Sequence, residues 1–326
     1  MGLISAEKMA AACKMLDEAS TVVIATHVDP DGDAVGSSLG LAGLLRAEGK
    51  TVTVYDRDPV PYNYKFLPGA ESLGDRLPEA CDLLCLLDCS SRERAGEKLA
   101  AWRGARRTLC IDHHLTATAE ADLNLIYPEA SATGELVYEL ARVRNPGFGA
   151  DIALNLYTAI LTDTGSFRYS NASPSAFAAA GDLVARGVNP WDVTQQVYES
   201  HPLARIKLLA LVLETLQLSP SGRAASVTVT REMFAATGSN SEFTDGMINY
   251  PRSIAGVEVA FMVRETGDNE YKVSFRSRGR VNVAELAAEY GGGGHHNAAG
   301  CRMQGSLDEI NRRVFRMIEE RLGSVN

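Results

Sequence analysis

A histidine and two aspartates come directly after an apolar segment near the start of the chain. The segment Val22–Ala25 is partly β-branched, which is typical of a buried parallel strand. The charged and polar residues that follow it are His27, Asp31 and Asp33. No lysine or arginine lies among them, so they need a cation, and this mixture of ligands suits Mn²⁺, Mg²⁺ or Zn²⁺. The simpler alternative is a polar loop in which Asp33 only caps the next helix.

Two further apolar segments end in the same kind of residue. Leu83–Leu87 is followed by Asp88, and Thr108–Ile111 is followed by Asp112–His114. Neighbouring strand ends lie close together in a sheet, and ligands of open α/β sheets bind beyond the carboxyl ends of the strands. We therefore expect these side chains to meet those that follow the first strand.

A fifth acidic residue follows a predicted buried helix. The helix spans Ile152–Leu161, and Asp163 comes after it in mostly apolar surroundings. A carboxylate in such surroundings is costly unless a cation or hydrogen-bond donors accompany it. Asp163 is therefore expected to have a cation or donors beside it.

The C-terminal third carries two features that could bind phosphate. In the predicted strand Tyr271–Ser277, alternation places Lys272, Ser274, Arg276 and Arg278 on one face. Such a row is usually a solvated surface, but arginine also matches phosphate oxygens. Further on, residues 291–300 read Gly-Gly-Gly-Gly-His-His-Asn-Ala-Ala-Gly, and such a loop exposes backbone N–H groups to an anion. We predict a phosphate-contacting loop there rather than a merely flexible one.

The elements that must position these residues alternate between strands and helices, which predicts an α/β fold. We expect a first domain with a parallel sheet over residues 1–190, a helical linker over 191–220, and a smaller α/β domain over 221–326. One of the helices is predicted to begin at about Ala132 with Ser131 as its cap. The other main predicted helices are Ala6–Glu18, Ala34–Glu48, Pro174–Arg186 and Leu307–Leu322.

Composition narrows the class of protein. The net charge of −9 argues against binding of long nucleic acids, but it allows a small phosphorylated substrate held by a metal and a few arginines. No apolar run approaches the roughly 20 residues of a membrane span, and the N-terminus lacks the features of a signal peptide. The six cysteines form no C-x-x-C pair, so we expect reduced core thiols and a cytoplasmic protein.

Taken together, these motifs resemble those of the DHH phosphoesterase superfamily. The four matching motifs are His27-x-x-x-Asp31-x-Asp33, Asp88, Asp112-His113-His114 and Asp163. The segment 291–300 resembles the signature of the DHH-associated C-terminal domain, and Asp163–Tyr169 and Phe66–Pro68 resemble the compact NrnA-like members. One departure is Asn282, where an aspartate is common in the family.

The resemblance implies a two-metal hydrolase with two Mn²⁺ ions, or with Mg²⁺ or another divalent cation in their place. It implies one ion at His27, Asp31 and Asp88, and a second ion at Asp33, Asp88, His113 and Asp163. Asp88 would then bridge the two ions. His114 would contact the phosphate or protonate the leaving oxygen, and Asp112 would orient a histidine.

The resemblance also implies the substrates. NrnA-like proteins degrade very short oligoribonucleotides, and several dephosphorylate 3′-phosphoadenosine-5′-phosphate (pAp). The expected substrate-binding residues are Arg168, Ser274, Arg276, Gly293, Gly294 and His295. Two alternatives stay open, namely a soluble phosphodiesterase for pApA or cyclic dinucleotides and a non-catalytic nucleotide sensor. A homodimer is a further expectation.

Overall fold

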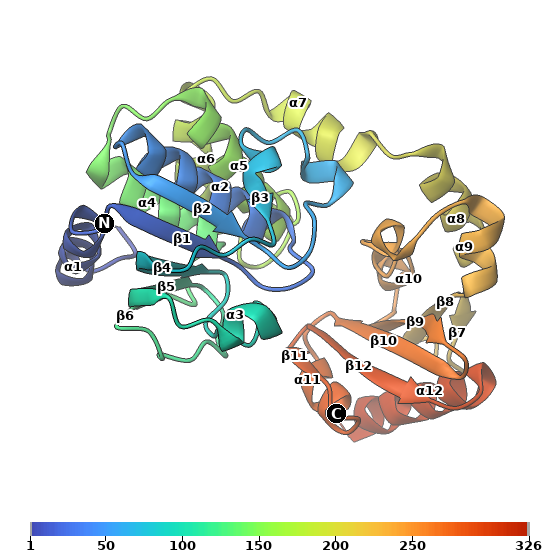
Figure 1. The fold of residues 1–326 in the computed structure, drawn as a ribbon. Coiled ribbons are helices and arrows are strands. Elements are labelled where there is room, and N and C mark those ends of the chain that lie inside the picture. The colour runs from blue at the N-terminus through green and yellow to red at the C-terminus, as the bar shows by residue number, and fades with distance from the viewer. Residues whose placement is uncertain (1, 325–326) are drawn as a thin grey trace. The chain divides into compact units, whose positions relative to one another are not determined.

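The structure, a computed structural model, describes residues 2–324 apart from the side chains of His295 and Ser324. The chain divides into two compact units, one up to Ser200 and one from His201 onward. The first unit holds the strands β1 to β6 and the second holds β7 to β12 (Figure 1). Each unit has its own sheet and its own apolar core.

The sheet of the first unit has six parallel strands in the order β3-β2-β1-β4-β5-β6. Strand β1 lies next to β4, and β4 lies next to β5, so the three strands that precede the motif residues are neighbours. Their carboxyl ends share one edge because all of them run in the same direction. The strands are β1 (Thr21–Ala25), β2 (Thr51–Tyr55), β3 (Leu73–Gly74), β4 (Cys81–Leu87), β5 (Ala105–Asp112) and β6 (Leu123–Ile126).

Helices cover both faces of this sheet. Val22 and Ile24 of β1 belong to the large core that includes α1, α2, α4, α5 and α6, whereas Val23 and Ala25 face a smaller cluster with α3. The buried strand residues therefore alternate between two helical layers, as expected for a sheet that is covered on both sides. The helices are α1 (Ala6–Asp17), α2 (Gly32–Ala47), α3 (Glu97–Ala101), α4 (Thr133–Arg144), α5 (Ala150–Asp163), α6 (Pro174–Ala185) and α7 (Pro190–Thr194), with the 3₁₀ helices η1 (Tyr62–Tyr64) and η2 (Ala70–Ser72) and the π-helix η3 (Gln195–Glu199).

Helices α2 and α5 approach each other closely through glycine. A Cβ atom on Gly32 would lie 2.4 Å from Oγ1 of Thr162, and one on Gly36 would lie 2.5 Å from the backbone oxygen of Asn155. Real Cβ atoms do not approach so closely, so only glycine allows this packing. The close contact holds Asp33, at the start of α2, near Asp163, at the end of α5.

The second unit is built on a mixed sheet in the order β11-β12-β10-β9-β8-β7. Strands β8 and β9 are parallel, and the other pairs are antiparallel. Helices α11 and α12 pack on one face, and α8 packs on the other. The elements are α8 (Leu203–Glu214), β7 (Gln217–Leu218), β8 (Ala224–Val229), α9 (Arg231–Thr237), the 3₁₀ helix η4 (Ser241–Thr244), α10 (Asn249–Ser253), β9 (Val259–Gly267), β10 (Glu270–Ser277), α11 (Val283–Ala288), β11 (Gly293–His295), β12 (Ala298–Gln304) and α12 (Leu307–Ser324).

The predicted α/β fold class, with a parallel N-terminal sheet and a second α/β part, is confirmed. The three-part division at residues 190 and 220 stays a prediction. Among the described residues, none of the helices has both the length and the apolar character needed to cross a bilayer. All six cysteines are free thiols, and five of them are buried.

Two local predictions of backbone structure were wrong. Ser131 does not cap α4. The helix begins at Thr133, its N-cap position is Ala132, and the first backbone N–H groups of α4 donate to Asp33 instead. The predicted phosphate-contacting loop at 291–300 is largely regular structure, since it includes the hairpin of β11 and β12, and its phosphate contact stays a prediction. Gly292 and Gly294 serve close packing, since a Cβ on Gly292 would lie 2.2 Å from the backbone oxygen of Gly300 and one on Gly294 would lie 2.4 Å from that of Ala298.

Candidate metal centre

The motif residues that follow the central strands meet around Asp88. Oδ2 of Asp88 lies 3.4 Å from Nε2 of His27, and Oδ1 lies 3.6 Å from Nε2 of His113. Asp88 is almost fully buried at the end of β4, and its backbone is in the left-handed region with φ of 56°. Residues other than glycine uncommonly adopt this conformation, although aspartate does so more readily than most, and such backbone is concentrated at functional sites.

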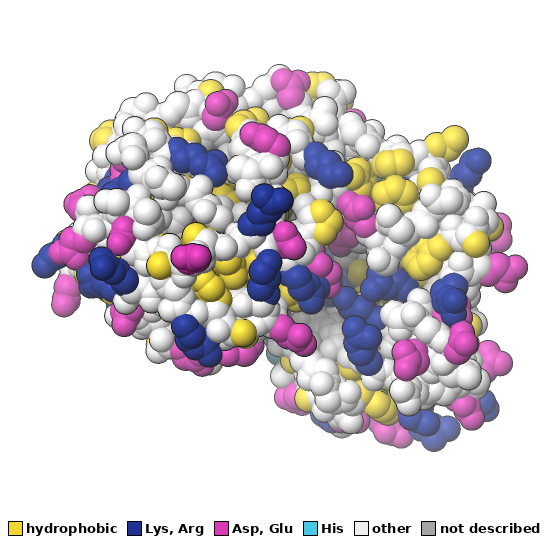
Figure 2. All heavy atoms as spheres, viewed as in Figure 1, with side chains coloured by type: hydrophobic (Ala, Val, Ile, Leu, Met, Phe, Trp, Pro, Cys, Tyr) yellow, Lys and Arg dark blue, Asp and Glu magenta, His cyan; other side chains and the backbone are white. Residues whose placement is uncertain are grey.

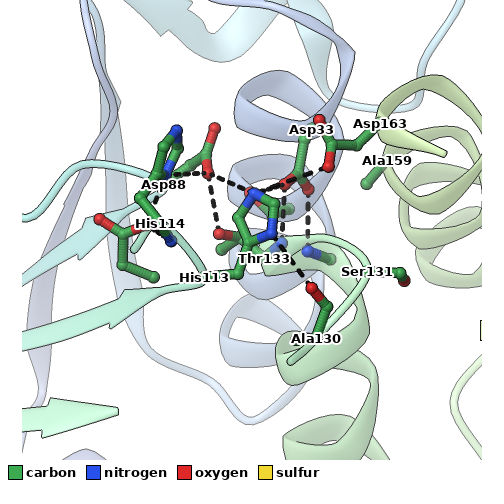
Figure 3. A network of polar contacts seen from close by, with 12 residues as sticks. Asp33, Asp88, His113, His114, Ala130, Ser131, Thr133, Ala159 and Asp163 are labelled. Atoms are coloured by element: carbon green, nitrogen blue, oxygen red, sulfur yellow. Dashed lines mark hydrogen bonds and ion pairs between the residues drawn. The ribbon is translucent and has the colours of Figure 1, made fainter. Parts of the chain in front are cut away.

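Asp33 and Asp163 complete the group from the helical layer. Nε2 of His113 lies 3.8 Å from Oδ2 of Asp33 and 3.6 Å from Oδ2 of Asp163. In Figure 3, four of these side chains point toward one another from different elements, namely Asp33, Asp88, His113 and Asp163. The predicted convergence of strand ends and helix ends is therefore present in the structure.

Backbone carbonyls orient two of the histidines. Nδ1–H of His27 donates to the backbone oxygen of Val28 at 2.9 Å, and Nδ1–H of His113 donates to that of Ala130 at 3.2 Å. A carbonyl only accepts, so in each ring Nδ1 carries a proton, and Nε2 is the atom that faces the carboxylates. This arrangement of a histidine is typical of a metal ligand.

His114 is held by Asp112 instead. Oδ1 of Asp112 lies 2.6 Å from Nδ1 of His114 and also accepts the backbone N–H of His114 at 2.9 Å. Asp112 is fully buried at the end of β5. Burial alone would lower the pKa of His114, but the hydrogen bond that the ring donates to Asp112 and the charges of Asp88 and Asp112 outweigh burial and raise the pKa.

Asp31 and Asp33 have different roles at the start of α2. Asp31 is the N-cap, since its side chain accepts from the backbone N–H groups of Asp33 and Ala34. Asp31 is exposed and lies 3.9 Å from Nε2 of His27. Asp33 is buried, and its carboxylate points to the N-terminus of α4. The alternative in which Asp33 only caps its own helix is therefore wrong.

The electrostatics of this cluster favour positive charge. Burial and the nearby charges of Asp88 and Asp163 raise the pKa of Asp33 well above its ordinary value. Burial also raises the pKa of Asp163, to about 7, with a further contribution from Asp31. For His27, burial lowers the pKa, but Asp88 and Asp31 outweigh burial and raise it to about 10. The carboxylates thus repel one another and attract protons, and a divalent cation would satisfy the same demand.

Among the described side chains, three sets could each hold a metal ion, and the ligand atoms of each set lie within 4.8 Å of one another. Asp88 belongs to two of the sets, and His113 also belongs to two. Imidazole nitrogen and carboxylate oxygen are suitable ligands for first-row divalent metals. The sets are His27 with Asp31 and Asp88, Asp33 with His113 and Asp163, and Asp88 with His113 and His114. The residues present therefore fit a divalent cation.

Two residues that donate hydrogen bonds to the carboxylates of this cluster were not predicted from the sequence. Nδ2 of Asn171 donates to Oδ2 of Asp163 at 3.2 Å and to the backbone oxygen of Ser131 at 2.8 Å. Oγ1 of Thr133 donates to Oδ1 of Asp88 at 3.0 Å. The sequence gives no signal for either contact, because neither residue type at its position implies a carboxylate partner.

Of the predicted substrate-binding residues, one lies in the first unit. Arg168 is exposed, and its Nε donates to the backbone oxygen of Gly165 at 2.6 Å. It follows a tight turn in which three consecutive residues have left-handed backbone, with φ of 57° at Gly165, 62° at Ser166 and 59° at Phe167. Its role in binding stays a prediction.

The other predicted substrate-binding residues lie in the second unit. Ser274 and Arg276 are half-buried on the same face of β10 and pair with Gly300 and Ala298 of β12. Gly293 and Gly294 lie in β11, as does the backbone of His295, whose side chain is outside the part that the structure describes. The pattern of β10 agrees with the predicted alternation, but the phosphate contacts stay a prediction.

The parallel sheet of the first unit and its carboxylate–histidine cluster are features of a known protein family, and comparison of the sequence with family models identifies it. Residues 21–162 match the N-terminal domain of the DHH family, and residues 227–320 match the DHHA1 domain. The chain belongs to the DHH family of phosphoesterases, in the group that carries a DHHA1 domain, and is an enzyme of that family.

Within this family, the chain is similar to proteins named bifunctional oligoribonuclease and PAP phosphatase NrnA. The relative from Thermus thermophilus is 33% identical, over 92% of this chain and 90% of its own length. The relative from Bacillus subtilis is 28% identical, over 90% of this chain and 92% of its own length. Among solved structures, an exopolyphosphatase-related protein from Bacteroides fragilis has a TM-score of 0.91 and 29% identity and matches 98% of both chains.

Proposed function

We propose that this phosphoesterase depends on Mn²⁺ and hydrolyses very short oligoribonucleotides to mononucleotides and pAp to AMP. The observation that carries the proposal is the position of Asp88, whose two carboxylate oxygens face different histidines of one buried cluster. The substrates are supported by the names of the relatives from T. thermophilus and B. subtilis, whose similarity spans nearly the whole chain.

We propose two cation sites that share Asp88. His27 and Asp31 would hold one ion with it, and Asp33, His113 and Asp163 would hold the other with it. When bound, divalent cations neutralise phosphoryl charge and lower the pKa of water, which is the chemistry that hydrolysis near neutral pH requires. Asp33 and Asp163 would lose protons on binding, since their pKa values are raised.

His114 is the proposed proton donor to the leaving oxygen. Asp112 accepts the Nδ1 proton of His114, which leaves the second ring nitrogen for the substrate. The raised pKa of His114 favours the charged ring, and a charged imidazole can donate a proton or hold a phosphate oxygen. Asp112 would act by keeping the ring in this orientation.

The proposal of short substrates follows from charge. The chain has a net charge of −9, and on the face of the first unit in Figure 2 basic and acidic side chains are interspersed rather than gathered in a basic stripe. Long strands are retained by basic grooves and stacking platforms, each stacked base adding about 1–3 kcal/mol. Added nucleotides should therefore contribute little to binding. Arg168, Ser274, Arg276 and the segment that carries Gly293, Gly294 and His295 are the proposed phosphate donors.

The test is a hydrolysis assay with Mn²⁺ over pAp, pApA, oligoribonucleotides of three, five and twenty residues, cyclic-di-AMP and pyrophosphate, each repeated with a chelator. We expect chelator-sensitive turnover of pAp and of the shortest RNAs and a steep fall for the twenty-residue strand. Equal efficiency on short and long strands would contradict the proposal. Turnover of only pApA or cyclic-di-AMP would favour the dinucleotide phosphodiesterase, and nucleotide binding without any turnover would favour the sensor.

The role of Arg276 can be tested in the same assay. Arg276→Ala should weaken turnover of short substrates and leave Mn²⁺ binding unchanged, because Arg276 is on β10 of the second unit. Lys272→Ala is the matched control, since Lys272 is on the same strand and the same face. Equal losses in both variants would argue against a specific phosphate contact by Arg276. The cytoplasmic location and the homodimer remain expectations from the sequence.

A further inference from the structure

Thr133 contacts two of the central carboxylates at once. It is the first residue of α4 and is fully buried. Its backbone N–H donates to Oδ2 of Asp33 at 2.7 Å, and its hydroxyl donates to Oδ1 of Asp88 at 3.0 Å. Figure 3 shows Thr133 between these two residues, which come from α2 and from the end of β4. One residue thus connects the helical layer to the strand that carries Asp88.

The N-terminus of α4 is held firmly in this position. Gly134 also donates its backbone N–H to Asp33, at 2.8 Å from Oδ1, so Asp33 receives the first two amides of the helix. A Cβ atom on Gly134 would lie 2.4 Å from Cβ of Ala159 in α5, so α4 and α5 are packed as closely as glycine permits. Carboxylates are stabilised at helix N-termini, and this contact fixes where the hydroxyl of Thr133 lies.

The hydroxyl of Thr133 restrains the rotation of the Asp88 carboxylate about its terminal torsion. The two oxygens of Asp88 face different partners, with Oδ1 3.6 Å from Nε2 of His113 and Oδ2 3.4 Å from Nε2 of His27. The terminal torsion of an aspartate is broad, so the carboxylate rotates easily unless a donor fixes it. Oδ1 also lies 3.3 Å from Nδ1 of His114, a ring that titrates, whereas the hydroxyl of Thr133 is a donor to Oδ1 that does not titrate.

We infer that Thr133 is a positioning residue for the metal centre, whose hydroxyl holds the Asp88 carboxylate so that each oxygen faces its own set of ligands. The inference rests on the proposed function, because it assumes that the cluster binds divalent cations. Thr133 itself contacts neither an ion nor the substrate in this account. It acts through Asp88 alone.

The test uses three variants of the full-length protein and Mn²⁺ as the probe. Thr133→Val keeps the shape and the backbone N–H to Asp33 and removes only the hydroxyl, whereas Thr133→Ser restores the hydroxyl. Thr158→Val is the matched control, because Thr158 is also fully buried and its hydroxyl donates to the backbone oxygen of Leu154, within α5. Calorimetric titration with Mn²⁺ gives the affinity, and urea unfolding with chelator present gives the stability without metal.

We expect Thr133→Val to bind Mn²⁺ about 10- to 100-fold more weakly than the unaltered chain, the range found when an outer partner of a metal ligand is removed. Thr133→Ser and Thr158→Val should keep the affinity, and the two valine variants should lose similar stability in chelator. If Thr133→Val does not fold, Thr133→Ala replaces it.

Unchanged Mn²⁺ affinity in the variant that lacks the hydroxyl would overturn the inference, as would equal losses of affinity in Thr133→Val and Thr158→Val. A loss of affinity in Thr133→Ser as large as in Thr133→Val would also overturn it. If the unaltered chain binds no divalent cation, the proposed function fails instead. The titration of the unaltered chain therefore separates the two failures.

Discussion

Gly36 of α2 lies so close to Asn155 of α5 that a Cβ atom on the glycine would be 2.5 Å from the backbone oxygen of Asn155. Asp33 lies at the start of α2, and Asp163 is the last residue of α5. The spacing between two of the central carboxylates is therefore set by backbone packing rather than by the carboxylates themselves.

Replacing this glycine should damage both stability and activity. Gly36→Ala forces α2 away from a rigid backbone atom, and we expect a loss of about 1–3 kcal/mol in the free energy of unfolding, with weaker Mn²⁺ binding. Gly181→Ala in α6 is the control, because its added Cβ would meet no atom within 4 Å, and the change should stabilise by up to about 1 kcal/mol. Urea unfolding and Mn²⁺ titration of both variants check this, and equal stability of the two would contradict the packing argument.

Stability should depend on pH through Asp56. Its Oδ1 accepts the backbone N–H of Asp58 at 2.8 Å, whereas Oδ2 is buried with no hydrogen-bond partner in the part of the chain described. Burial raises the pKa of Asp56 to about 7, above its ordinary value, so the folded state holds this proton more tightly than the unfolded state does. The contribution of Asp56 to stability is thus full at about pH 4 and is lost as pH rises to about 7.

Asp56→Asn removes this dependence. At pH 8 the variant should exceed the unaltered chain in stability by on the order of a few kcal/mol, and the difference should vanish near pH 4. Asp58→Asn should instead be less stable than the unaltered chain at pH 8. Burial alone would raise the pKa of Asp58, but Arg57 and the N–H of Asp29 outweigh it and lower the pKa. Urea midpoints from pH 4 to pH 8 in chelator measure both, and parallel curves for all three proteins would contradict this prediction.

Mn²⁺ should stabilise the protein, and chelator should remove that gain. Burial and mutual repulsion raise the pKa values of Asp33 and Asp163, so ionised carboxylates destabilise this cluster unless a cation accompanies them. At a free concentration 100 times its dissociation constant, a ligand adds about 2.7 kcal/mol. His27→Ala should lose part of this gain. An equal gain in that variant would place the stabilising ion elsewhere in the molecule.

The sequence was most informative where the signal is local. Asp88 and Asp112–His114 each follow directly on an apolar run, and parallel strands bring such ends together, so their meeting could be predicted. The pairing of Asp33 with Thr133 could not, because the two residues are 100 positions apart and the contact is made by a backbone amide that every residue has.

Other misses have the same kind of cause. Ser131 has the right residue type for a helix cap, but a carboxylate from α2 already binds the first amides of α4. The glycines at 292 and 294 resemble a loop in the sequence, although they are required where β11 and β12 approach closely. The structural preference of a residue type is a local property. The cap of α4 depends instead on a segment that is distant in the chain, and the hairpin glycines depend on packing between two strands.

The central claim is that two cations share Asp88, and it is tested most directly by counting Mn²⁺ bound to Asp88→Ala while turnover of a diribonucleotide is measured at saturating Mn²⁺. Asp31→Ala is the comparison, because Asp31 is an exposed member of one ligand set only. We expect Asp88→Ala to lose about 100-fold or more in turnover and to bind fewer ions tightly, since a cation contributes several kcal/mol to such a reaction. The loss in Asp31→Ala should be smaller. Near-normal turnover and ion stoichiometry in Asp88→Ala would contradict the account.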